Sequence, residues 1–343
     1  MATTFAVPDG RVAMAATLYT GNGSTQSISN AVNTVSFQPN FVWMKGRSGA
    51  TDHALYDSVR GATFDLVSNS TAAETTQTTG LTTFGAAGFT VGALAKVNTS
   101  AATYVGWQWK AGGAAISNTA GTITSSVSAN TTAGFSVVTY TGTGANATVG
   151  HGLGVAPSMV IVKRRNSTGN WPVQHTSVSA SNVLFLDLTN AQTASTTFQQ
   201  IYPTASIFYI DGGNANVGAN GGTYVAYCWA PVAGYSAFGS YTGNGSADGP
   251  FVYTGFRPRW FMVKSSTNGI QQWYMWDSSR DTYNPESNTL YPNLSNAEAT
   301  SVLGDFVSNG VKIRQTLAGV NEFGGTYIYA AFAENPLKYA NAR

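Results

Sequence analysis

Apolar and polar residues alternate along most of the chain, in short runs separated by clusters of turn-forming residues. In the run TYVGWQW at 103–109, Val105, Trp107 and Trp109 share one face, because the side chains of a strand point alternately to its two sides. Turn signals rich in Gly, Ser, Thr and Asn recur roughly every 8–12 residues, a spacing typical of β-sandwiches. Helical periodicity is weak and confined to Ser295–Leu303. The pattern predicts an all-β protein.

Three landmarks occur three times in the same order. A YTGNG or YTGTG turn opens each segment, a proline and an apolar run ending in lysine follow, and a tyrosine-led strand closes it. The run after each proline is apolar on both faces, which indicates a central strand covered on both sides. The order and near-constant spacing predict three tandem β-sandwich or jelly-roll-like repeats of about 85–100 residues each.

The landmarks also set the domain boundaries. We predict an N-terminal arm at 1–12, repeats at 13–110, 134–234 and 235–333, an uncharged connector at 111–133, and a C-terminal tail at 334–343. The connector has two interpretations, a flexible linker or an extra hairpin. Its alternating segment TITSSVS at 122–128 favours the hairpin.

Composition narrows the function classes. Only 9% of residues are charged, against about 25% in ordinary soluble domains. A net charge of +2 is too small for phosphate-driven binding of nucleic acid. Half of the 32 charged side chains (17 basic plus 15 acidic) lie in 235–343. Either Ser, Thr and Asn solvate the rest of the surface, or the first two repeats pack against other subunits, because charges are depleted from interface cores.

The sequence also bears on the compartment. The N-terminus lacks the basic and apolar regions of a secretory signal, and no apolar run approaches the roughly 18 residues of a membrane span. Cys228 is the only cysteine, so no intramolecular disulfide is expected. The composition is typical of an extracellular protein, yet no export signal is present. This combination suggests a particle that is assembled in the host cytoplasm and released by lysis, and we therefore expect a virion component.

The sequence contains few groups of residues that could form a catalytic or metal site. His53, His151 and His175 are far apart and lack the spacing of metal ligands. No nucleophile elbow is present, and the acids of WDSSRDTYNPES (276–287) suggest local ion pairs in a polar loop rather than the carboxylate pair of a glycosidase. We expect a protein without enzymatic activity, catalytic residues, cofactor or metal.

Two sets of residues are candidates for contacts with a glycan or with another subunit. When HALYD (53–57), WPVQH (171–175) and WYMWD (273–277) are aligned, only the third carries two large aromatics on its alternate face. Such rings stack on sugars or fill interface pockets, unless a loop or second sheet covers them. A basic position also ends the strand after each proline, where a solvated strand end is the alternative. The candidate contact residues are Tyr274, Trp276, Lys45, Lys163, Arg164, Arg165 and Lys264.

The strings GFSVVTYTGTGANATVGHGLGVAPSMVIVKRR (134–165), YTGNGSADGPFVYTGFRPRWFMVK (241–264) and GGTYIYAAFAENPLKYANAR (324–343) carry a family resemblance. They resemble a domain of unknown function that recurs in virion proteins of tailed bacteriophages. The resemblance extends from about residue 13 to Arg343. It implies a tail fibre or other structural protein, and neither a reaction nor a defined site.

We therefore expect a non-enzymatic virion structural protein, in a tail fibre or tail-associated module for host attachment or for bridging virion parts. A head decoration protein is the alternative, because no heptad shaft is present; a polysaccharide depolymerase has less support. The expected partners are other virion proteins and a host surface glycan, with no nucleic acid and no membrane insertion. A homo-oligomer is expected, and the resemblance favours a trimer.

Overall fold

The computed structural model describes residues 5–334, and its regular secondary structure consists almost entirely of antiparallel strands. The predicted all-β fold class is confirmed. The first four residues of the predicted arm, and residues 335–343 of the predicted tail, lie outside the described residues. The helical elements are short: η1 (Gly10–Val12), α1 (Ala95–Asn98) and α2 (Ala318–Asn321). Among the described residues, no helix is long and apolar enough to cross a membrane.

One strand order occurs in three sheets, which we call the inner sheets. In each, the closing tyrosine-led strand lies between the opening strand and the strand that ends in lysine. In the first and third inner sheets the order is β1 (Met14–Thr20), β9 (Thr103–Trp109), β3 (Phe41–Gly46), β4 (Ala54–Asp57), and β20 (Ser236–Thr242), β27 (Thr326–Ala333), β22 (Pro258–Ser265), β23 (Trp273–Asp277). We call 13–110, 134–234 and 235–333 the first, second and third units. Tandem duplication as their origin stays a prediction.

The second inner sheet contains the same order and is longer at both edges. Its central strands are β12 (Phe135–Thr141), β19 (Thr223–Trp229), β14 (Met159–Arg164) and β15 (Pro172–His175), and its edges are β10 (Ile116–Asn118), β11 (Ser125–Asn130), β16 (Asn182–Phe185) and β17 (Thr193–Ala194). Strands β10 and β11 come from the connector and pair antiparallel. The connector is therefore an ordered strand pair that widens this sheet.

An outer sheet covers one face of each inner sheet, with fewer strands than the inner sheet in the first two units and four strands, as many as the inner sheet, in the third. The outer sheets are β2 (Gln26–Ser29), β8 (Gly88–Val91), β7 (Leu81–Gly85); β13 (Ala147–Gly150), β18 (Ile207–Ile210); and β21 (Phe251–Tyr253), β26 (Gly310–Ile313), β25 (Ala299–Val307), β24 (Glu286–Thr289). A short ladder, β5 (Phe64–Asp65) with β6 (Thr75–Thr76), follows β4. Each unit has its own apolar core between its two sheets. The weak helical signal near 295–303 was misleading, because β25 occupies much of that segment.

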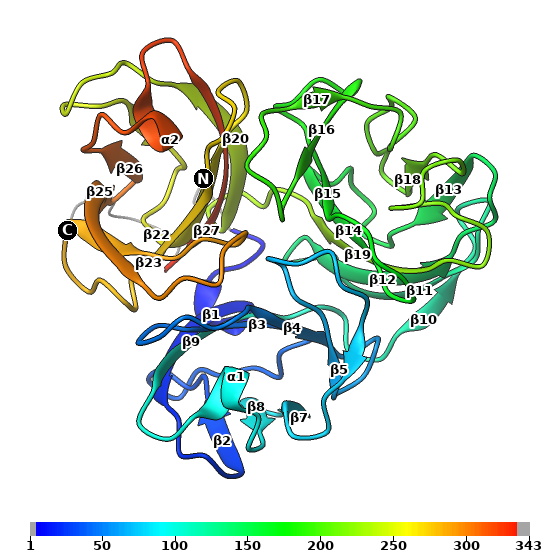
Figure 1. The fold of residues 1–343 in the computed structure, drawn as a ribbon, viewed down its shortest axis with the longest axis horizontal. Helices are drawn as coiled ribbons and strands as arrows, with labels where there is room; N and C mark the ends of the chain where they lie inside the picture. Colours follow the sequence, from blue (N-terminus) through cyan, green and yellow to red (C-terminus); the bar gives the residue numbers. More distant parts are fainter. Residues whose placement is uncertain (1–4, 335–343) are drawn as a thin grey trace.

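The opposite faces of the three inner sheets meet in one shared core. Figure 1 shows the units as three lobes around a common centre. Residues of all three units contribute, including Trp109, Trp229 and Phe332 from equivalent places on the closing strands. The Trp109 ring centroid lies 6.2 Å from that of Trp229 and 5.7 Å from that of Phe332. Both faces of the central strands of each inner sheet are therefore buried, which is why these strands are apolar on both sides.

Candidate functional site

The structure does not support an exposed aromatic patch at Tyr274 and Trp276. Their exposed fractions are 5% and 0%, because the face of β23 that carries them packs against the outer sheet of the third unit. The Trp276 ring stacks on Phe261 at 5.5 Å, and its Nε1 donates to Thr289 Oγ1 at 3.1 Å. The prediction of a surface patch is wrong, and the alternative, cover by a second sheet, is what the structure shows.

The three repeated lysines are also buried rather than exposed at strand ends, so their prediction as surface residues is wrong. Lys45, Lys163 and Lys264 are at most 1% exposed. Burial lowers the pKa of Lys45 and Lys163 to about 8 and that of Lys264 to about 7. A buried ammonium must have hydrogen-bond acceptors, and here backbone carbonyls supply them.

Each lysine reaches a carbonyl oxygen in another unit. Lys45 Nζ donates to Ser295 O of the third unit at 3.2 Å. Lys163 Nζ donates to Thr71 O of the first unit at 2.8 Å, and Lys264 Nζ to Thr189 O of the second unit at 2.7 Å. The three contacts therefore run in one direction around the centre and close the units into a ring.

Arg164 and Arg165 are partly exposed. Arg164 Nε donates to Asn166 Oδ1 at 3.2 Å, within the same turn. Arg165 instead binds Glu74 of the first unit with two hydrogen bonds, of 2.9 and 2.8 Å. Like the three lysines, Arg165 thus takes part in an interface between units of one chain.

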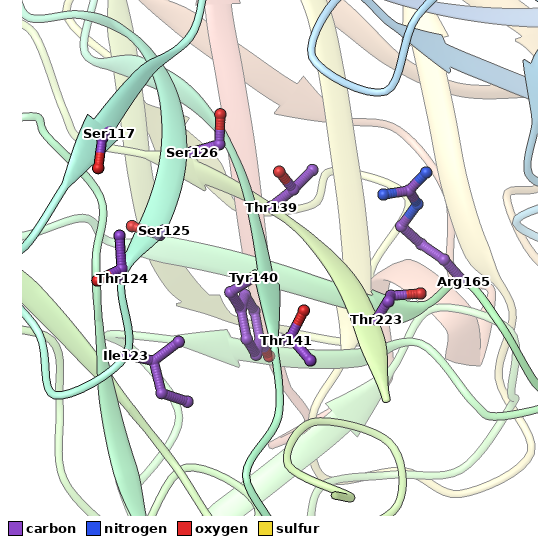
Figure 2. Close-up of a pocket in the computed structure, with 10 residues that line it drawn as sticks. All are labelled: Ser117, Ile123, Thr124, Ser125, Ser126, Thr139, Tyr140, Thr141, Arg165 and Thr223. Atoms are coloured by element: carbon purple, nitrogen blue, oxygen red, sulfur yellow. The ribbon is translucent and has the colours of Figure 1, made fainter. Parts of the chain in front are cut away.

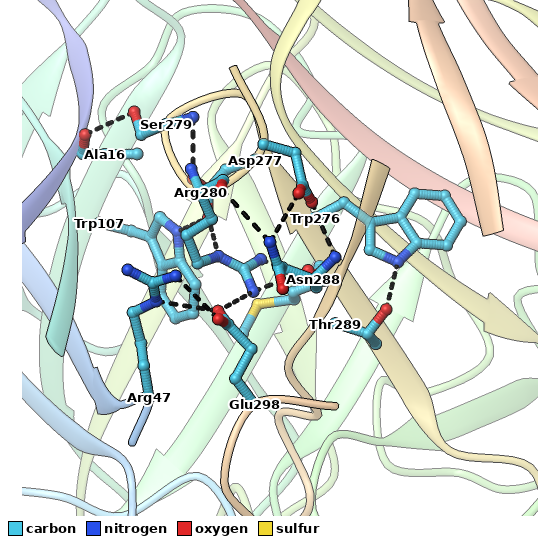
Figure 3. A network of polar contacts seen from close by, with 12 residues as sticks. Ala16, Arg47, Trp107, Trp276, Asp277, Ser279, Arg280, Asn288, Thr289 and Glu298 are labelled. Carbon is cyan, nitrogen blue, oxygen red and sulfur yellow. Dashed lines mark hydrogen bonds and ion pairs between the residues drawn. The ribbon is translucent and has the colours of Figure 1, made fainter. Parts of the chain in front are cut away.

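A buried ionic cluster lies between the third and first units (Figure 3). We call Asp277, Arg280, Glu298 and Arg47 the second polar node. Arg280 Nε donates to Asp277 Oδ2 at 2.6 Å and its Nη1 to Glu298 Oε2 at 3.0 Å. Trp107 of the first unit donates Nε1–H to Asp277 Oδ2 at 2.9 Å, and Arg47 binds Glu298 at 2.8 and 3.0 Å. The side chains of Asp277 and Arg280 are fully buried.

The first polar node has the same design between the first and second units. It comprises Asp57, Arg60, Glu74 and Arg165, and Tyr227 takes the place of Trp107. Arg60 Nε donates to Asp57 Oδ2 at 2.5 Å and Nη1 to Glu74 Oε2 at 2.8 Å. Tyr227 Oη donates to Asp57 Oδ2 at 2.9 Å. In both nodes the buried arginine is thereby paired with two acidic side chains.

The third interface, between the second and third units, has no such node. The equivalent positions hold His175 and Val178, facing Ala330, which has no polar side chain. His175 Nε2 lies 3.2 Å from Tyr329 O. Burial lowers the pKa of His175 to about 4, so its ring is neutral at pH 7. Ion pairs join two of the interfaces, whereas the third is joined by apolar packing and by hydrogen bonds such as that from Lys264 Nζ to Thr189 O.

The other potentially reactive groups have structural partners. His53 accepts the Trp43 indole N–H at 2.8 Å, and its other ring nitrogen lies 2.8 Å from Tyr291 O of the third unit. His151 is buried beside Thr204 O at 3.1 Å. Burial raises the pKa of Cys228 to about 12, so its thiol is not ionised at pH 7. Within residues 5–334, no three His, Cys, Asp or Glu side chains are placed to hold a metal.

Glu286 is a buried carboxylic acid whose pKa is strongly raised. It is fully buried, and neither carboxyl oxygen has a hydrogen-bond partner. Burial, with the nearby charges of Asp281 and Asp277, raises its pKa to about 9. A buried acid with a raised pKa is a candidate proton donor when it faces a cleft. Glu286 lines none of the three grooves described below, and it is a neutral core acid at pH 7.

We expect Glu286→Gln to stabilise the protein increasingly as the pH rises from about 5 to about 9. In this window the unfolded chain loses the Glu286 proton and the folded chain keeps it, so wild-type stability falls with pH. Glutamine cannot ionise and removes this loss, which at pH 7 is of the order of a few kcal/mol. Urea unfolding of both proteins at about pH 5 and pH 8.5 measures the difference. The matched control is Glu322→Gln, at an exposed position. The prediction would be contradicted if the stability difference between Glu286→Gln and the wild type did not change with pH, as is expected for the control.

Three of the grooves on the described surface are considered as candidate sites. The first, of about 370 Å³, lies where the connector hairpin widens the second inner sheet. Hydroxyl side chains and the Arg165 guanidinium line it, and Figure 2 shows Ser117, Ser126, Thr139 and Thr223 around it. No carboxylate lines this groove, so it lacks the acid pair of a glycosidase. The second, of about 360 Å³, lies beside β1, and the third, of about 510 Å³, lies beside Tyr283 and Phe306.

The sequence analysis expected local ion pairs in a polar loop at 276–287, and the structure contains one between Asp277 and Arg280, but buries it between two units. A signal for the nodes was present: DSVR (57–60) and DSSR (277–280) follow equivalent strands. In both, the aspartate accepts the backbone N–H of the arginine three residues later, at 2.8 Å in the first and 3.0 Å in the second. The second unit has HTSV (175–178) there, without an arginine.

The fold and its contacts define a class: an all-β protein in which three sandwich units surround one shared core. The chain belongs to a family described as "Domain of unknown function (DUF7483)", whose profile matches residues 12–336. This single match spans all three units. No curated protein and no solved structure matches the chain.

Proposed function

We propose that the protein is a non-enzymatic structural component of a tailed-bacteriophage virion, located in the virion and acting in the tail for host attachment or for bridging virion parts. The observation that carries the proposal is the use of the buried charges. Both polar nodes and all three lysines join one unit to another. Such an arrangement supports a rigid ring-shaped body more than a reaction centre, which needs its ionisable groups at a cleft.

Two further points support this proposal. The family resemblance described above is to virion proteins of tailed phages. The first groove also offers few reactive groups: it is lined by hydroxyls and by one guanidinium that is already bound to Glu74. A homo-oligomer, with a trimer favoured, stays part of the proposal.

Head decoration is the second candidate. The described chain folds into three lobes around a centre and contains no elongated shaft (Figure 1). A body of this form suits the binding of a capsid lattice.

Location in the virion tests both candidates. We expect mass spectrometry of purified particles to contain the protein, and gold-labelled antibodies to mark the tail. Label on the head would replace the tail assignment by decoration. Particles without the protein would contradict a virion role, and release of reducing ends from host polysaccharide by the purified protein would contradict the non-enzymatic assignment.

A further inference from the structure

Two aromatic side chains project from the outer sheet of the third unit. Phe251 and Tyr253 lie on β21 with exposed fractions of 46% and 67%, on the face turned away from the core that receives Val252. The strands β25 and β26 of this sheet lie at the rim of the molecule (Figure 1). We call Phe251 and Tyr253 the aromatic platform. Exposed apolar surface of this kind marks interaction sites.

The Phe251 ring lies against a glycine of the neighbouring strand, and the Tyr253 ring lies beside Gly255. A Cβ added to Gly310, on the neighbouring strand, would be only 2.8 Å from the Phe251 ring. A Cβ added to Gly255 would lie 3.6 to 3.9 Å from the outer end of the Tyr253 ring. A side chain at Gly310 would therefore lift the Phe251 ring away from the sheet. Both side chains are well exposed, so ring surface of each is open to solvent.

Hydrogen-bonding groups of both charges surround the platform. Lys312 is directly opposite Phe251 in the ladder, and Asp305 is opposite Lys312. Lys312 pairs with Asp248 at 2.7 Å, and Arg314 pairs with Asp305 at 2.6 Å. Two positive and two negative groups give this surface no net charge. It has no electrostatic preference for an anion such as a phosphate or a sulfated chain.

The other two units lack the platform. The residues on either side of the inward-facing Ile28 of β2 are Ser27 and Ser29, and those beside Val149 of β13 are Thr148 and Gly150. Ser27 bonds to Thr90 within its own sheet at 3.1 Å. The feature is therefore not required by the sandwich itself, and the serine pair of the first unit is a built-in control.

We propose that the aromatic platform binds a neutral glycan built of hexopyranose units. A hexopyranose has an apolar C–H face, which stacks on an open aromatic ring, and equatorial hydroxyls, which hydrogen-bond to flanking side chains. Phe251 and Tyr253 supply the stacking faces for adjacent sugar units along β21. Lys312 and Asp305 supply donors and acceptors beside them. The inference rests on the proposed attachment function and names its ligand class and site.

The test is a titration of the full chain with 13C-labelled Phe and Tyr rings. The probes are methyl β-glucoside, methyl β-galactoside, cellohexaose and a β-1,4-galactan hexasaccharide. We expect the ring signals of Phe251 and Tyr253 to shift saturably, and the hexasaccharide of the preferred sugar to bind at least tenfold more tightly than its methyl glycoside. Phe251→Ala with Tyr253→Ala should weaken that binding at least tenfold, whereas Ser27→Ala with Ser29→Ala should change it less than twofold.

Several results would overturn the inference. These are no saturable shift with any of the four sugars, equal weakening by both double variants, and tighter binding of chondroitin sulfate than of the neutral sugars. Sedimentation that shows self-association abolished by the platform variant would identify a second copy of the chain as the occupant instead. The virion-location experiment is independent of the titration, so a protein found in particles that binds no sugar refutes only the glycan site.

Discussion

Replacing Arg280 by methionine is expected to lower the free energy of unfolding by about 3 to 5 kcal/mol, the cost of leaving a buried partner charge unpaired. Arg280 is the centre of the second polar node. Its guanidinium contacts Asp277, Glu298, the carbonyl oxygens of Asn288 and Met275, and the Trp107 ring at 5.8 Å. Without it, the fully buried Asp277 keeps only neutral donors. Urea unfolding followed by tryptophan fluorescence measures the loss.

A second substitution separates the charge effect from lost packing. Adding Asp277→Asn to Arg280→Met removes the orphaned charge, and its amide oxygen can still accept from Trp107 Nε1. We expect the double variant to recover about 2 kcal/mol of the loss, as coupled residues do not add. The exposed Arg314→Met, which breaks the pair with Asp305 at the surface, should cost under about 1 kcal/mol. An Arg280→Met protein as stable as the wild type would refute the assignment of this node as an interface support.

The sequence predicts the all-β class and the alternation of each strand, because both follow from the short-range pattern of apolar residues. Val105, Trp107 and Trp109 share one face, as expected, and that face contributes to the shared core. Local alternation does not show which part of the protein packs against each face of a strand. The face of Gly106 and Gln108 packs inside the first sandwich, and the face of Trp107 packs against other units.

The lysines illustrate a second limit of sequence reasoning. A lysine at the end of an apolar strand is usually solvated, and its repetition three times indicated only that the position has one role. Long-range contacts decide that role: Ser295, Thr71 and Thr189, whose carbonyl oxygens accept from the lysines, lie in loops of other units. No periodicity links a loop carbonyl to a lysine in a different unit. The burial of these lysines therefore becomes visible only in the assembled ring.

The polar nodes could be predicted from the sequence only in part. The recurrence of Asp-Ser-x-Arg after two equivalent strands was visible in the sequence, and a paired local motif at the ends of buried strands suggests a shared structural role. The sequence did not contain the partners Trp107 and Tyr227, which approach from other units. Their equivalent in the remaining unit is Ala330, and the facing acid is replaced there by His175. The interface between the second and third units therefore lacks both the aromatic hydrogen-bond donor and the aspartate that accepts from it.

The aromatic face of β23 yields the last prediction, that Trp276→Ala will destabilise the fold strongly. The substitution removes a fully buried indole, its stacking on Phe261 and its hydrogen bond to Thr289. Large-to-small changes of this kind cost about 3 to 5 kcal/mol, because the lost contacts leave a cavity that relaxes only in part. A receptor-contact residue would behave in the opposite way, weakening host binding at an unchanged melting temperature. Tyr253→Ala, at the exposed platform, is the matched aromatic control and should change the free energy of unfolding by less than about 1 kcal/mol. Thermal and urea unfolding of the two variants compare these sites directly. A Trp276→Ala protein with the melting temperature of the wild type would show that the packing between β23 and the outer sheet does not stabilise the third unit.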